Sequence, residues 1–418
     1  MKLSLDKFQI FVLSIYLFFN TYALFYLLYY EKTFSDFNEP ATDTNLIFLS
    51  YVGVIGPFIL FSLYVYPFLQ NKFKGSNNKN EISIRLQTKV TIFVLVLQVL
   101  FLIYNLITGV NSAGSTIKTD STIKFIFIIL SPDIFFLILY GFARNNKYFK
   151  YNLMIYLISN IQRGWMGGIF FIIILELYIY FKKYGFSKKI ISIFLVFGLV
   201  TLFLLPYLVA LKWGARVYFG GLSNDLVKEL EIILTLGNQP YIDSLLESIS
   251  YLFGRFQILS NVYLVIENID TLINLKEKNE FVSVFSMGLP QLLFYKIAQL
   301  EYITLDSYFV SLIVDNTNND ITWNTHLGWM GWIIPQPELF IIYFFYSCLL
   351  IFLILFFTKH IGGEYLFFIS WFMTVVLLLQ GWIQAYIGYL LGLITFFIIK
   401  VILKKFKIQR RTNETKQI

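Results

Sequence analysis

Long apolar runs constrain this chain more than any other feature. Runs of about 20 mostly apolar residues recur as far as residue 403, and charged residues make up only 14% of the 418 residues. As an α-helix, such a run crosses a hydrocarbon core of about 30 Å, and a helix satisfies every backbone polar group in lipid. The sequence therefore predicts an all-α, polytopic membrane protein and excludes a soluble globular fold.

About ten transmembrane helices are predicted. They lie at roughly 8–30, 45–70, 90–109, 123–143, 149–160, 164–181, 190–211, 337–358, 363–381 and 383–403. The chain then divides into a first transmembrane bundle of about seven helices (1–211), one large loop (212–336), the last three spans (337–403) and a basic tail (404–418). The apolar run from Phe8 is too long for a signal peptide and lacks a small-residue cleavage site, so we interpret it as an uncleaved first helix.

The distribution of lysine and arginine predicts the orientation of the chain. Alternate short loops and the tail hold 21 of these residues, whereas the opposite short loops hold only Lys32, Lys118 and Arg163. Basic residues gather in the short loops on the cytoplasmic side. We therefore expect both termini in the cytoplasm and the loop 212–336 on the outer side.

The large loop is acidic, with thirteen Asp and Glu against seven Lys and Arg, which argues against nucleic acid as a partner. The segment from Ile242 to Leu275 has helical spacing and a broad apolar face. We expect it to form helices lying against the outer surface of the membrane. Trp323, Trp329 and Trp332 are then predicted at the interface, where amphipathic rings collect.

Arginine is the most informative residue type. Of seven arginines, three (Arg163, Arg216 and Arg255) fall on the predicted outer side, against the bias of short loops. The planar guanidinium fork suits the oxygens of phosphate and diphosphate groups. Three outward arginines therefore favour an anionic ligand delivered from the membrane; the alternative for each is a surface arginine or one paired with a carboxylate.

Residues 159–168, with the sequence Ser-Asn-Ile-Gln-Arg-Gly-Trp-Met-Gly-Gly, carry a resemblance. A short helix ending in Ser-Asn, then Arg-Gly and a glycine-containing apolar helix, followed soon by a large outer loop, resembles the Wzy family of O-antigen and capsule repeat-unit polymerases. The likeness covers nearly the whole chain in topology but rests on few residues.

The resemblance implies a GT-C-like fold at the bacterial inner membrane. It implies transfer of a growing glycan from undecaprenyl diphosphate to a new lipid-linked repeat unit on the periplasmic face. It also implies binding of the diphosphate by Arg163, Arg216 and Arg255, and a chain-length regulator as a partner. We expect no cofactor and no metal, since the first outer loop, Glu31 to Asp43, lacks the Asp-x-Asp pattern of metal-using lipid-linked glycosyltransferases.

Such a transfer needs a base for the acceptor hydroxyl. The candidates are His326, Glu267 and Glu338. His326 is the one outer histidine, placed as an acid–base histidine is in the similar O-antigen ligase family; the alternative is a histidine bonded at the membrane interface. Glu267 lies twelve residues beyond Arg255 on the same predicted helix; the alternative is a carboxylate on a solvated face. Glu338 follows two prolines at a helix start, where a carboxylate also suits the helix dipole.

Two carboxylates, Asp133 and Glu176, fall within predicted spans and should face the interior of the bundle. Either could pair with a polar neighbour such as Gln98 or Gln380 and fix helix packing; a proton path is the alternative.

Two other functions stay open. A flippase or transporter of the same lipid-linked glycan would favour twelve or more spans and short outer loops, unlike this chain. An O-antigen ligase has a similar layout, and the sequence separates it poorly from a polymerase.

Overall fold

The fold is helical throughout the part of the chain that the computed structural model describes. That part comprises residues 5–34, 37–74, 83–113, 122–185, 188–221, 223, 225–288, 291, 294–295, 298, 303–314 and 325–414. Its only β pairings are two isolated bridges, Lys32 with Pro40 and Val282 with Thr304. The predicted all-α fold class is confirmed for these residues.

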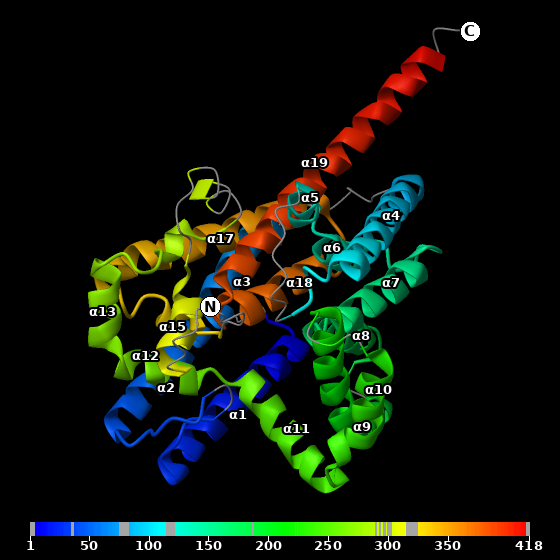
Figure 1. The fold of residues 1–418 in the computed structure, drawn as a ribbon. Helices are drawn as coiled ribbons and strands as arrows, with labels where there is room; N and C mark the ends of the chain where they lie inside the picture. The colour runs from blue at the N-terminus through cyan, green and yellow to red at the C-terminus, as the bar shows by residue number, and fades with distance from the viewer. Residues whose placement is uncertain are drawn as a thin grey trace.

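The N-terminal helices run back and forth through the bundle (Figure 1). They are α1 (Lys7–Tyr30), α2 (Thr44–Ile59), which continues through a π-helical turn (Leu60–Val65) into α3 (Tyr66–Lys74), α4 (Ile84–Thr108), α5 (Thr122–Leu130) and α6 (Pro132–Phe142). Asp6 starts α1 by accepting a hydrogen bond from the Gln9 backbone, and Asp43 caps α2 through the backbone of Asn45 and Leu46. These caps fix where the first two spans begin.

The next three helices precede the predicted large loop in the chain. They are α7 (Phe149–Gln162), α8 (Met166–Tyr184) and α9 (Lys188–Phe219). The predicted loop boundary at 211/212 falls inside α9, which continues as a helix to Phe219. Because the helix does not stop there, Lys212 and Arg216 belong to the end of a membrane helix rather than to a loop.

Seven helices are long and apolar enough to cross a membrane, within the described residues. They are Lys7–Tyr30, Thr44–Phe73, Ile84–Thr108, Ile123–Phe142, Gly198–Phe219, Pro337–Ile361 and Ile383–Leu403. A multi-pass membrane protein is therefore the class of protein that this fold defines. A bent helix pair, Tyr241–Phe256 with Leu259–Glu267, would make eight spans if it crossed as one.

Three of the ten predicted spans are not among these seven. Helix α7 has 14 residues, about 21 Å at 1.5 Å per residue, which is short of a 30 Å core. Helix α8 has 19 residues but carries Glu176, Lys182 and Lys183. The run predicted at 363–381 forms only a short apolar helix, Leu366–Leu378, before the chain turns. Local hydropathy predicted these segments as apolar, but it did not fix the lengths of their helices.

The large loop folds into several short helices. They are α10 (Leu226–Thr235), a 3-10 turn (Leu236–Asn238), α11 (Tyr241–Phe256), α12 (Leu259–Glu267), α13 (Ile269–Glu277), a second 3-10 turn (Val284–Ser286), α15 (Leu305–Val314) and α16 (Gly328–Gly331). The expectation that the helices of Ile242–Leu275 all lie on the membrane surface is wrong for α12. It packs against α1, α2 and α16, and its residues 259–265 are all buried.

The C-terminal helices close the bundle. They are a 3-10 turn (Pro337–Leu339), α17 (Phe340–Ile361), α18 (Leu366–Met373), a π-helical turn (Thr374–Leu378) and α19 (Ile383–Glu414). At its N-terminus α16 docks on the turn before α19: Gly328 N donates to Gln380 O at 3.1 Å, and a Cβ on Gly381 (φ +88°) would lie 2.6 Å from Gly328 N. This contact needs glycine at position 381, and Gly328 has a left-handed backbone (φ +71°) that favours glycine as well.

The tryptophans of this segment lie in the core rather than at an interface. Trp329 is buried, stacks on Tyr343 and donates to Ser347 Oγ at 2.9 Å. Trp332 is buried and donates to Gly381 O at 2.7 Å. The predicted interfacial positions are therefore wrong for both, because docking against α17 and the 379–382 turn satisfies each indole N–H inside the protein; Trp323 lies outside the described residues.

Candidate anion-binding site

Arg163 lies where α7 ends and the chain turns into α8. Its side chain is 5% exposed, and its Nη2 donates to Asp133 Oδ2 at 2.8 Å while Nε donates to Ser159 O at 3.1 Å. The guanidinium also sits 4.9 Å from the centre of the Phe101 ring. Carbonyl, carboxylate and ring thus hold the fork of Arg163 in one orientation.

Gly164 brings Arg216 to this turn. Gly164 has a left-handed backbone (φ +66°), and a Cβ there would meet Arg216 Cγ at 2.6 Å and Lys212 O at 3.1 Å. Arg216 Nε approaches Gly164 O at 3.4 Å, and its guanidinium lies 4.9 Å from the Trp213 ring. The glycine after Arg163 is therefore what lets the end of α9 come close.

Lys212 and Arg255 meet at one tyrosine. Lys212 Nζ donates to the hydroxyl of Tyr251, and Arg255 Nε donates to the same hydroxyl at 3.2 Å. Both cations also lie over the Tyr251 ring, at 4.5 Å and 5.2 Å. Arg216 is near enough to Arg255 for the two charges to interact. Helices α9 and α11 thus bring their basic residues to a shared place.

We call Lys212, Arg216 and Arg255 the cation cluster. Of the three sequence-predicted arginines, the structure brings Arg216 of α9 and Arg255 of α11 together. The guanidinium of Arg163 lies against Asp133 and Phe101 instead, one residue before the Gly164 carbonyl that Arg216 approaches. Lys212, Tyr251 and Asp133 were not predicted as site residues. The signal for two of them was the spacing, since Lys212–Arg216 and Tyr251–Arg255 are both four residues apart and so share a helix face.

The cation cluster lies at the end of a membrane helix. Helix α9 has 32 residues, about 48 Å at 1.5 Å per residue, whereas a hydrocarbon core is about 30 Å thick. At least one end of α9 therefore extends beyond that core. Lys212 and Arg216 stand near its C-terminus, and because cations are costly within the core, they suit an anion at the level of lipid headgroups.

His326 lies in the protein interior. It is 2% exposed, its Nε2 is 3.2 Å from Gln257 O, and its ring stacks on Trp382. Gln257 occupies the break between α11 and α12, where its side chain bridges Phe34 O and Ser260 N. His326 therefore contacts the break that follows Arg255.

The predicted relation between Arg255 and Glu267 is wrong. They do not share one helix, because the chain breaks at Gln257 and α12 leaves α11 at 64°. Asn20 Oδ1 accepts from Ile258 N at 3.1 Å and so replaces a helical hydrogen bond at the break. A tertiary contact from α1 thus overrides the helical spacing of this segment.

Glu267 accepts a hydrogen bond from Tyr263 at 3.0 Å. Burial, with the nearby carboxylates of Glu39 and Asp43, raises the pKa of Glu267 above its ordinary value. Glu338 is exposed in the turn before α17, and its charge interacts with that of Lys276. Burial lowers the pKa of Lys276. The three base candidates thus lie in three different surroundings.

Both carboxylates predicted within spans pair with arginines rather than with Gln98 or Gln380. Asp133 holds Arg163, whereas Glu176 accepts from Arg144 and from the Tyr140 hydroxyl. Arg144 is one of the 21 basic residues from which the orientation of the chain is predicted. Each arginine offsets the cost of a carboxylate near lipid.

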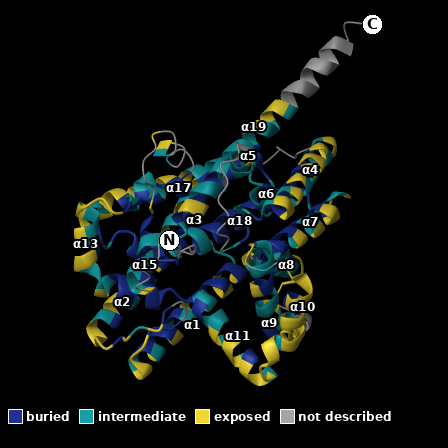
Figure 2. Ribbon diagram, in the orientation of Figure 1, coloured by how far each residue is buried: buried dark blue, intermediate teal, exposed yellow. Residues whose placement is uncertain are grey.

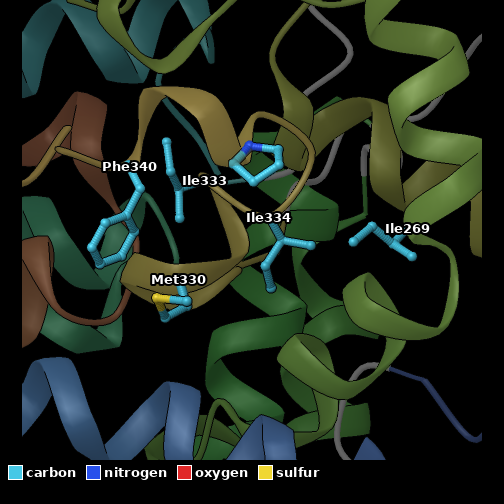
Figure 3. A pocket seen from close by; sticks show the side chains of 6 residues that line it. Ile269, Met330, Ile333, Ile334 and Phe340 are labelled. Atoms are coloured by element: carbon cyan, nitrogen blue, oxygen red, sulfur yellow. The ribbon is translucent and has the colours of Figure 1, made fainter. Parts of the chain in front are cut away.

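An apolar pocket lies on another part of the molecule. Its volume is about 250 Å³, and it is lined by Ile269, Met330, Ile333, Ile334, Pro337 and Phe340 (Figure 3). This lining offers no charged group to an anion, so the pocket is not a candidate for the same ligand.

Among the described residues, no group of three or more His, Cys, Asp or Glu could hold a metal ion. Independence from metals stays a prediction. Comparison of the chain with protein-family models, with curated proteins and with solved structures finds no match.

Proposed function

We propose that this protein is a polymerase of undecaprenyl-diphosphate-linked oligosaccharide repeat units, acting on the periplasmic face of a bacterial inner membrane. The observation that carries the proposal is the convergence of Lys212, Arg216 and Arg255 near the end of a membrane helix, with Arg163 one residue before the Gly164 carbonyl that Arg216 approaches. A site with several cations at a lipid boundary suits a ligand with an anionic head and an apolar tail.

The cation cluster suits the negative charge that develops on the leaving diphosphate in this reaction. The acceptor hydroxyl attacks the anomeric carbon of the growing glycan, the bond from that carbon to the diphosphate oxygen breaks, and undecaprenyl diphosphate leaves. Negative charge grows on the diphosphate as the bond breaks, and fixed cations in a partly dry site stabilise it. Arg163 is oriented beforehand by Asp133 and Ser159.

The hydroxyl proton passes to a base. His326, Glu267 and Glu338 stay candidates for this role. A raised pKa suits Glu267 to accept a proton near neutral pH, although Tyr263 holds its carboxylate at the far end of α12. Asp133 serves instead to position Arg163, because its carboxylate oxygen is already committed to that guanidinium.

An O-antigen ligase would use the same donor and the same leaving group, so the cation cluster suits it equally. A flippase would bind the same headgroup without breaking a bond. The test must therefore read out the product rather than ligand binding.

The experiment uses a bacterial strain that lacks its own copy of the gene, with surface glycans resolved by gel electrophoresis. A polymerase predicts that deletion leaves a single repeat on the lipid core and that the full-length chain restores a ladder. Absence of any surface repeat, with lipid-linked units accumulating, would reject the polymerase and favour a ligase or a flippase.

Variants then connect the activity to the site. Arg163→Ala, Arg216→Ala and Arg255→Ala should each lower polymer formation by about 100-fold, the usual loss when one donor to a developing anion is removed. Arg85→Ala is the matched control, since Arg85 is exposed on α4. Protein amounts are compared by immunoblot, and equal ladders from all four variants would reject the assigned site.

A further inference from the structure

Helix α11 has an unusual distribution of burial for a helix in water. It buries Ser244 and Ser248, whereas Ile242 and Leu246 are 68% and 60% exposed. A surface helix of a soluble protein turns its apolar face inward and its polar face outward. The reversed arrangement means that apolar surroundings lie outside α11.

Helix α10 also exposes apolar residues, together with Lys228 and Glu231. The one residue it buries is Glu229, and Ile233 beside it packs on Gly214 of α9. Its exposed apolar residues include Leu226, Val227, Leu230 and Leu234. Exposed residues predominate along the outer side of α10 and α11 in Figure 2.

Both ends of α11 contact residues that lie inside membrane spans. Tyr241 donates its hydroxyl to Phe203 O at 2.8 Å, and Phe203 belongs to the span Gly198–Phe219. At the other end, Phe253 packs on Phe19 and Tyr22 of the span Lys7–Tyr30. The helix therefore does not stand clear of the membrane.

A polar edge limits how deep α11 can lie. Asp243 and Glu247 are exposed and follow Ile242 and Leu246 by one residue, which rotates them by about 100° around the helix. Carboxylates are costly within the hydrocarbon core but not at headgroup level. Tyr241 reaches Phe203 and Tyr251 reaches Lys212, so α11 runs alongside α9. Its charged edge therefore faces headgroups or water while its apolar side faces acyl chains.

We propose that α10 and α11 form a hairpin embedded in one leaflet of the membrane, with Ile242, Leu246 and the exposed leucines of α10 in contact with acyl chains. The exposed apolar surface of α9, which includes Phe203, continues onto this hairpin. The proposal is independent of the polymerase assignment.

The hairpin then forms the wall between lipid and the cation cluster. Tyr251 and Arg255 lie on the side of α11 that meets Lys212 of α9, whereas Ile242 and Leu246 face outward. One helix thus separates the basic groups from the acyl chains. A phosphate headgroup reaches these groups with its tail still in the bilayer.

Electron paramagnetic resonance on the full chain in lipid vesicles tests the hairpin. Cys348 is replaced by alanine, and single cysteines at Ile242, Asp243, Leu246 and Glu247 carry a nitroxide label. These side chains are exposed, so the label disturbs little packing. Collision rates are compared for oxygen, which concentrates in lipid, and for a water-soluble nickel chelate. Phe203→Cys is the control for a lipid-facing site, and Lys278→Cys, outside the hairpin, for an exposed polar site.

We expect the oxygen-to-nickel ratio at Ile242 and Leu246 to match that at Phe203 and to exceed that at Asp243 and Glu247 several-fold. Ratios that are low and equal at all four positions would place α11 in water and overturn the proposal. Protection of Ile242 and Leu246 from both reagents would show that protein, such as a second copy of the chain, covers this face, and would overturn it as well.

Discussion

Arg163 and Asp133 form an ion pair with 2.8 Å between Nη2 and Oδ2, although they are 30 residues apart and on different helices. Asp133 stands in the first turn of α6, and Arg163 follows the last turn of α7. The pair connects these two helices. It also gives Arg163 one fixed orientation, one residue before the Gly164 carbonyl that Arg216 of α9 approaches.

Asp133→Asn should lower the stability of the protein by about 2 kcal/mol. Removing one partner of a buried pair costs about 3–5 kcal/mol, but the Asp133 side chain is 31% exposed, so solvent screening reduces the loss. The double variant Asp133→Asn with Arg163→Gln should recover part of it, because no unpaired charge remains. Melting can be followed by the reaction of Cys348 with a thiol-specific dye. If the stability losses of the two single variants simply add in the double variant, the proposed ion pair is contradicted.

Gly164→Ala should abolish or strongly reduce polymer formation. A left-handed backbone costs an L-residue about 1–2 kcal/mol, and the new Cβ would displace Arg216, whose Cγ lies 2.6 Å from that position. Gly167→Ala is the control, since nothing lies within 4 Å of its Cβ position. Both variants are compared by their glycan ladders at equal protein amounts. A normal ladder from Gly164→Ala would mean that the position of Arg216 does not matter.

Tyr251→Phe should weaken the binding of inorganic diphosphate about tenfold. Its hydroxyl orients Lys212 and Arg255, and hydrogen bonds to charged groups contribute about 1.5–3 kcal/mol, where 1.4 kcal/mol is a factor of ten. Titration calorimetry on the purified protein measures the affinity. Tyr218→Phe, a half-buried tyrosine of α9, should leave it unchanged. Equal affinities for all three proteins would remove Tyr251 from the site.

Glu267→Gln should stabilise the protein at neutral pH and not at acidic pH. The pKa of Glu267 is raised by burial and by nearby Glu39 and Asp43, so folding favours the protonated carboxyl. The native state therefore loses stability as pH rises from the unfolded pKa through the folded one. Melting temperatures of both proteins between pH 4 and pH 8 check this; a gap that is constant with pH would argue against a titrating Glu267.

The spans were largely predictable from local sequence. Seven of the predicted spans correspond to long apolar helices, from Lys7–Tyr30 to Ile383–Leu403. The segments at 149–160, 164–181 and 363–381 differ because span length depends on where a helix ends. Arg163 with Gly164 ends α7, and the docking of Gly328 on the 379–381 turn fixes the end of the run after α18. Neither event is visible in hydropathy.

The candidate site was predictable in kind but not in arrangement. The outward arginines were found because a permanent charge on the predicted outer side is unusual. Asp133 was seen as a carboxylate in a span, yet its pairing with Arg163 could not be deduced from residues 30 apart. Helical spacing predicted Glu267 on the helix of Arg255. In the structure that helix ends before Ile258, whose backbone N–H donates to Asn20 of α1.

By itself, the sequence determined the helical membrane class, most spans and the residue types suited to an anion. These follow from local hydropathy and from the permanent charge of arginine, which every chain segment carries with it. The tertiary structure alone decided that Lys212, Arg216 and Arg255 meet, that Arg163 pairs with Asp133, that His326 is buried, and that α11 turns Ile242 outward. Those outcomes depend on contacts between segments far apart in the chain, such as Gly164 with Arg216 and Gln257 with His326, and local periodicity holds no information about them.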